Sequence, residues 1–222
     1  LQNYKASVEN INLSNKNIDN IPESSFDKFI KLKNLNLSNN KITELPENIF
    51  DKLTNLKDLD LSNNKITELP KNIFDKITKL EYLDLSNNKI TELPKNIFDN
   101  LTQLEYLVLN DNKITELPEN IFDKLTQLIE LYLNDNKITE LPKNIFNKLT
   151  QLKELYLTQN SSLSNNEFDY SIFGDQKDYF KERGIKITIF KPFEKKDYMF
   201  YDVNNLDNKL YLLPTLYLLL DD

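Results

Sequence analysis

The 222-residue chain contains no cysteine, no histidine and no tryptophan, and only two glycines. Without cysteine there is no disulfide and no thiol nucleophile, and without histidine the commonest general base and zinc ligand is missing. Two glycines cannot build a glycine-rich phosphate-binding loop. These absences exclude much of enzyme chemistry and predict a protein without catalytic residues, cofactor or metal.

Acidic residues outnumber basic ones, 35 to 28, and long apolar runs are scarce. The formal net charge of −7 argues against nucleic acid or an anionic membrane as partner. The longest apolar run, residues 210–220, is interrupted by Pro214 and falls short of the roughly 18 residues that a membrane helix needs. We therefore expect no nucleic-acid partner and no membrane span.

A 24-residue repeat runs through most of the chain. One unit, residues 32–55, reads LKNLNLSNNKITELPENIFDKLTN; four more follow in frame, and 14 of the 24 positions are identical in all five. More divergent units begin at Val8 and Leu152. The L-x-L alternation predicts a short strand in each unit. A single unit cannot cover its own apolar side, so neighbouring units must stack.

The pattern L-x-x-L-x-L-x-x-N-x-I-x-x-L-P-x-x-x-F-x-x-L-x-x resembles the leucine-rich repeat family in its 24-residue form with a phenylalanine spine. The phrase LPxxIFDKLTxLxxLxL is most similar to Toll-like receptor ectodomains and variable lymphocyte receptors, whose cysteine-bonded caps this chain lacks. The resemblance implies an α/β repeat fold. This is a curved solenoid with a concave parallel β-sheet and a mostly irregular or short-helical convex side, which holds a protein ligand on its concave face.

The repeats also suggest the domain organisation. We expect an N-terminal cap, about seven repeats, a helix–strand cap and an apolar tail, at residues 1–7, 8–160, 161–190 and 191–222. Within the second cap, residues 175–183 are expected to be helical and residues 185–190 to form one more strand. The tail is expected either to pack on the cap or the back of the solenoid, or to pair with a second copy.

A recurring asparagine is expected to hold the units together. A carboxamide both donates and accepts hydrogen bonds, so it can satisfy backbone groups of the next unit where the chain leaves the strand. We interpret this series as structural: Asn40, Asn64, Asn88, Asn112, Asn136 and Asn160.

Positions that differ between units carry the functional hypothesis, because the scaffold does not fix them. Around the middle strand leucine the residues change from Asn to acids and tyrosines along the chain. Tyrosine offers large contact area and a polar tip. We predict a docking surface for a protein or peptide of basic or amphipathic character, formed by Asp58, Asp60, Tyr82, Asp84, Tyr106, Val108, Glu130, Tyr132, Glu154 and Tyr156. The Ser or Asn and the Asn or Asp that follow each strand are expected on the same face.

This hypothesis predicts that replacing Tyr106 and Tyr132 by alanine abolishes binding with little effect on melting. Three alternatives stay open. The tyrosines can simply pair across the sheet while the acids provide solubility, or Asp58, Asp60 and Asp84 can bind Ca²⁺. The third is a self-associating structural scaffold, consensus-like or engineered, with a homodimer formed through the tail.

Asn-x-Ser sequons begin at Asn12, Asn36 and Asn160. Glycans on the first two would obstruct the predicted concave face, and small extracellular modules commonly use disulfides, which this chain lacks. The sequence therefore disfavours a disulfide-dependent extracellular setting. It favours a secreted or surface protein of bacterial type over a cytoplasmic one.

Overall fold

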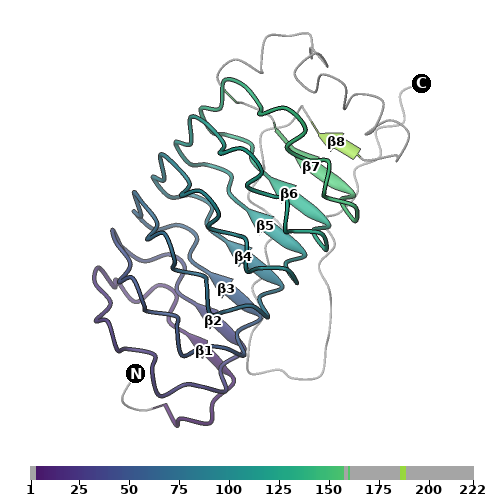
Figure 1. The fold of residues 1–222 in the computed structure, drawn as a ribbon. Helices are drawn as coiled ribbons and strands as arrows, with labels where there is room; N and C mark the ends of the chain where they lie inside the picture. Colours follow the sequence, from purple (N-terminus) through teal and green to yellow (C-terminus); the bar gives the residue numbers. More distant parts are fainter. Residues whose placement is uncertain (1–3, 158–159, 161–185, 189–222) are drawn as a thin grey trace, which may run out of the picture. The chain divides into compact units, whose positions relative to one another are not determined.

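The computed structural model describes residues 4–157, 160 and 186–188, which form a stack of repeats joined by one parallel sheet (Figure 1). The eight strands pair in sequence order, and every pair is parallel. They are β1 (Asn10–Asn12), β2 (Asn34–Asn36), β3 (Asp58–Asp60), β4 (Tyr82–Asp84), β5 (Tyr106–Val108), β6 (Glu130–Tyr132), β7 (Glu154–Tyr156) and β8 (Lys186–Thr188).

Equivalent residues of successive repeats lie opposite each other in the sheet. Leu35 of β2 pairs with Leu59 of β3, and the same register holds from β1 to β7. A slip of one residue would turn each central leucine to the other face, so burial fixes the register. β8 pairs in parallel with β7 and is the strand expected within residues 185–190. The helix expected over residues 175–183 and the tail at 191–222 lie outside the described residues.

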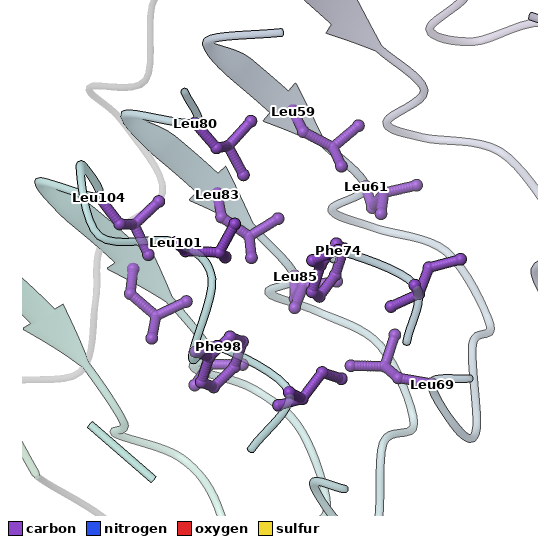
Figure 2. Packing of buried hydrophobic residues seen from close by; sticks show 14 of the residues in the cluster. Leu59, Leu61, Leu69, Phe74, Leu80, Leu83, Leu85, Phe98, Leu101 and Leu104 are labelled. Atoms are coloured by element: carbon purple, nitrogen blue, oxygen red, sulfur yellow. The ribbon is translucent and has the colours of Figure 1, made fainter. Parts of the chain in front are cut away.

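The core lies between the strands and the segments that return from one strand to the next. Figure 2 shows Leu59 and Leu83 of the strands, with Leu61 and Leu85, directed toward this interior. A spine of phenylalanines closes its far side, and all five are fully buried: Phe50, Phe74, Phe98, Phe122 and Phe146. The last four rings stack in succession with centroids 6.4, 6.5 and 6.1 Å apart. Each repeat therefore buries its apolar side against its neighbours.

The returning segments are built from consecutive turns. After Pro46, the amides of Ile49, Asp51 and Leu53 each bond a carbonyl three residues back. These bonds recur at alternate residues and do not form a continuous helical ladder, so of the two expected forms of this side, irregular or short-helical, residues 4–157 show the irregular one. Proline contributes because it has no amide N–H and disfavours a helical conformation at the residue before it. No helix in the described ranges is long and apolar enough to cross a membrane.

Candidate binding surface on the sheet face

Each strand divides its side chains between two sides. The central leucine enters the core, and the first and third residues point to the opposite side, which we call the sheet face. All ten residues of the predicted docking surface occupy first or third strand positions between β3 and β7. The topology therefore brings them to one side of the sheet, in neighbouring rows.

The recurring asparagine lies just beyond each strand and bonds only backbone groups. Asn64 Oδ1 accepts from the Ile42 amide at 3.1 Å, and its Nδ2 donates to the carbonyls of Leu37, Leu61 and Ser62 at 3.0, 3.1 and 3.2 Å. Ile42 and Leu37 belong to the preceding repeat, so the expectation that these asparagines bond the next unit is wrong in direction. Equivalent bonds recur from Asn40 to Asn160. They tie each repeat to the one before it.

The strand exits explain a second set of polar residues, which the sequence predicts on the same face as the binding surface. Asn63, Asn87 and Asp111 have φ values of 54, 52 and 54°. Asparagine and aspartate are the residues other than glycine that tolerate this left-handed conformation best. The position is therefore fixed by the turn. The signal was present in the sequence, because only Asn or Asp occurs there from Asn15 to Asp135.

On β2 to β4 the third strand residue also serves the turn. The Oδ1 atoms of Asn36, Asp60 and Asp84 accept from the amide two residues further on, at 2.9, 2.9 and 2.8 Å. Such side-chain bonds to a nearby amide are typical of asparagine and aspartate at turns. One oxygen of each aspartate is therefore occupied by the scaffold, and the other is left for a different partner.

Asp60 and Asp84 lie opposite each other on β3 and β4. Their residues are only 6% and 3% exposed. Asp84 Oδ2 accepts from the Tyr82 hydroxyl at 3.2 Å, whereas Asp60 Oδ2 is buried with no hydrogen-bond partner. Burial raises the pKa of Asp60, and burial together with the charge of Asp60 raises the pKa of Asp84 to about 7. The pair is thus poorly disposed to carry two negative charges at neutral pH.

On β6 and β7 the acids are paired within their own strands. The Tyr132 hydroxyl donates to Glu130 Oε2 at 2.6 Å, and the Tyr156 hydroxyl donates to Glu154. The two tyrosine rings stack with centroids 4.3 Å apart and 6° between their planes. Burial, followed by the Glu154 contact, raises the pKa of Tyr156. These side chains already satisfy one another.

The predicted surface is therefore accessible only in part. Half of its residues are exposed or half-exposed, namely Asp58, Tyr82, Tyr106, Glu154 and Tyr156. The other half are buried, namely Asp60, Asp84, Val108, Glu130 and Tyr132. Because Tyr132 is packed against Tyr156, its removal disturbs the sheet, and the expectation that melting stays nearly unchanged does not suit this residue. In the part of the chain that is described, no three acidic side chains are placed to share a metal ion, so Asp58, Asp60 and Asp84 do not form a calcium site.

The stacked parallel strands, asparagine ladder and phenylalanine spine define a β-solenoid of leucine-rich repeats. The leucine rich repeat family matches residues 6–66, 54–114 and 102–163, and the chain belongs to this family. No curated protein matches significantly. Among solved structures the chain is similar to one in the Drosophila Toll–Spatzle complex, a molecular hub in development and innate immunity. The identity is 30% and the TM-score 0.57, over 64% of this chain and 19% of that one, so the chain spans less than a fifth of that relative.

Proposed function

We propose that the protein is a non-enzymatic recognition module that binds a protein or peptide ligand on the sheet face between β3 and β7. Leucine-rich repeat domains are generally non-catalytic and typically bind proteins. Fold alone does not define a ligand, so the proposal rests on the site. The curvature expected of such a stack makes the sheet face concave toward that ligand.

One observation carries the proposal: the sheet face holds half-exposed tyrosines and acids that the scaffold does not require. The same strand positions are occupied by Asn10, Asn12, Asn34 and Asn36 in β1 and β2, which pair in the same register. Tyr82 and Tyr106 are half-exposed neighbours with ring centroids 6.3 Å apart and planes tilted by 42°. Tyrosine is enriched at interfaces because it gives large contact area at low entropy cost. The acids favour a ligand of basic or amphipathic character.

The test is selection of ligands from a random peptide library displayed on phage, with the full chain immobilised. The expected result is a family of basic or amphipathic peptides whose binding falls at least about tenfold in Tyr82→Ala and Tyr106→Ala. Lys124→Ala, on a returning segment, is the matched control and should bind normally. Selection of no peptide, or equal binding by the tyrosine variants, would contradict the proposal. Light scattering over a wide concentration range shows whether the sheet face is tested in a monomer.

A further inference from the structure

Two carboxyl groups are buried side by side on the sheet face without a cation beside them. In the described part of the chain the salt bridges are Lys33–Glu9 and Lys57–Glu81, at 2.8 and 2.6 Å, and neither includes Asp60 or Asp84. Burying a carboxylate without a charged partner is unfavourable. The folded chain therefore loses stability by holding these two acids here.

The scaffold itself does not need an acid at this position. Asn36 is the equivalent residue on β2, and its Oδ1 accepts from the Ser38 amide at the same 2.9 Å that separates Asp60 Oδ1 from the Ser62 amide. An uncharged carboxamide thus closes the turn equally well. What aspartate adds at position 60 is a second carboxyl oxygen, and this Oδ2 is buried without a partner. Burial raises the pKa of the Asp60 carboxyl group and outweighs the side chains of Ser62 and Ser38, which interact with this group and lower its pKa.

We propose that Asp60 and Asp84 together anchor an arginine side chain of the ligand, an inference that rests on the proposed function. A guanidinium presents a planar fork of N–H donors that matches carboxylate oxygens. It supplies the donor that Asp60 Oδ2 lacks and takes the place of the Tyr82 hydroxyl on Asp84 Oδ2. That hydroxyl lies at 3.2 Å, a longer contact than the 2.6 Å between Tyr132 and Glu130. Rotation of the half-exposed Tyr82 uncovers the pair.

The surroundings favour arginine over other cations. Tyr82 and Tyr106 are the first residues of β4 and β5, with ring centroids 6.3 Å apart, and a guanidinium stacks on aromatic rings of this kind. A lysine ammonium is more strongly hydrated and loses more on entering a site this buried. A metal ion needs more ligands than the pair offers, since no set of three suitable side chains exists among the described residues.

Arginine binding is coupled to release of a proton. Burial raises the pKa of both carboxyl groups, and that of Asp84 lies at about 7. On the flanking strands the facing positions hold Asn34 and Asn36 on β2 and Tyr106 and Val108 on β5; Asp58 and Tyr82 share the strands of the pair. None of these is a cation, so the empty pair retains a proton. The guanidinium stabilises the ionised pair and displaces that proton, so affinity rises with pH through about 7.

The experiment uses the full chain labelled with ¹³C at its aspartate carboxyl carbons and observed by NMR. The probe is acetyl-arginine amide, and acetyl-citrulline amide is the uncharged control of nearly equal shape. We expect the arginine probe to shift the Asp60 and Asp84 signals, lower the apparent pKa of the pair, and bind at least about tenfold more tightly at pH 8 than at pH 5. Citrulline should do none of this. Asp60→Asn should weaken arginine binding about tenfold, and Asp123→Asn should leave it unchanged.

Equal binding of arginine and citrulline, binding independent of pH, or full affinity in Asp60→Asn would each overturn the anchor. Asn36 indicates that Asp60→Asn keeps the turn, and a melting curve verifies it. The two proposals can fail separately. A selected peptide that loses affinity in Tyr82→Ala but not in Asp60→Asn overturns the arginine anchor and leaves the recognition surface standing. Arginine capture by a chain that selects no peptide overturns the recognition surface alone.

Discussion

Strands β2 to β4 and strands β5 to β7 use the same repeat positions in opposite ways. In the first group a third strand residue, Asn36, Asp60 or Asp84, bonds the amide two residues on. In the second group Val108, Tyr132 and Tyr156 replace it, and the tyrosine hydroxyls bond glutamates of their own strands. The glutamates of β6 and β7 are thus bonded within their own strands, whereas on β3 the Asp60 Oδ2 atom has no hydrogen-bond partner. Buried oxygens without a hydrogen-bond partner occur in both halves, Asp60 Oδ2 in the first and Asn110 Oδ1 and Asn134 Oδ1 in the second, and of these three only Asp60 is an acid.

What the two halves share should be the most costly to remove. Asn64 and Asn136 each accept from one amide and donate to three carbonyls, although they lie in different halves. Asn64→Ala and Asn136→Ala should each lower the free energy of unfolding by about 3 kcal/mol, because buried backbone groups lose their partners. Urea unfolding measures this. Asn100→Lys is the control, since Asn100 is exposed and the other repeats carry lysine at this position. A clear inequality between the two ladder variants would show that the halves differ in scaffold as well as in surface.

Replacing a tyrosine by alanine should lower the stability to different extents in the two halves. Tyr132 is buried, stacked on Tyr156 and bonded to Glu130, so Tyr132→Ala should lower the free energy of unfolding by about 3 kcal/mol. Tyr82 is half-exposed, and Tyr82→Ala should cost less than about 1 kcal/mol. Thermal and urea unfolding of the two variants make the comparison. Similar losses would mean that the tyrosines are structural throughout, as the alternative of simple cross-strand pairing holds.

The pH dependence of the free energy of unfolding should report the titration of the buried acids Asp60 and Asp84. Folding raises the pKa of Asp84 from 3.8 to about 7, so between these values the folded chain binds more protons than the unfolded chain. The stability of the fold is therefore not lowered by the pair below about pH 4, and it falls as the pH rises through about 7 and the pair ionises. Asp84→Asn should flatten this slope and raise the free energy of unfolding by about 1–2 kcal/mol near pH 8.

Asp123→Asn is the matched control for this titration, because the next repeat carries Asn147 at the equivalent position on the returning segment. It should leave the slope over the same pH range intact. Part of the slope should remain in Asp84→Asn, because burial also raises the pKa of Asp58 on β3 to about 6. An unchanged slope would assign the titration to groups other than Asp84.

Much of the scaffold could be predicted from the sequence because identical positions repeat. The strands, their parallel order and the buried leucines follow from the L-x-L pattern and its spacing, and a recurring Asn64 or Asn88 implies a repeated polar contact. Whether Asp60 or Tyr132 is covered could not be predicted in this way. On a parallel sheet, exposure depends on the size of the side chains on both neighbouring strands, and these change from repeat to repeat.

Two further points have separate physical causes. The returning segments were expected to be mostly irregular or short-helical, and in residues 4–157 the bonds after Pro46 form separate turns, which is the irregular alternative. The strand exits, such as Asn63, were counted among the variable positions of the sheet face, which are the positions expected to inform about function. Their variation is confined to the residues that a left-handed φ of 54° permits. A position that varies between repeats can therefore still be determined by the backbone, when every residue found there tolerates the same left-handed φ.

The smallest expected effect concerns the two residues that follow each strand, which form different hydrogen bonds in the two halves. After β3, Asn63 Nδ2 donates to Ser62 Oγ at 3.2 Å. After β5 the polarity is reversed: Asn110 Nδ2 donates to Asp111 Oδ2 at 2.6 Å, and Asn110 Oδ1 is buried without a partner. Both forms keep a residue that tolerates left-handed φ, so exchanging them leaves the backbone intact.

Asn110→Ser removes the donor to Asp111, and Asp111→Asn replaces a charged acceptor with a neutral one, so each change alone should be destabilising. Together they recreate the Ser–Asn exit of the first half, in which Asn63 Nδ2 donates to Ser62 Oγ. A double-mutant cycle should therefore give a favourable coupling of about 0.5–1 kcal/mol. Additive effects would mean that the two residues vary independently. The residues that follow β5 would then not distinguish the two halves, and the contrast between the halves would be confined to the strand residues.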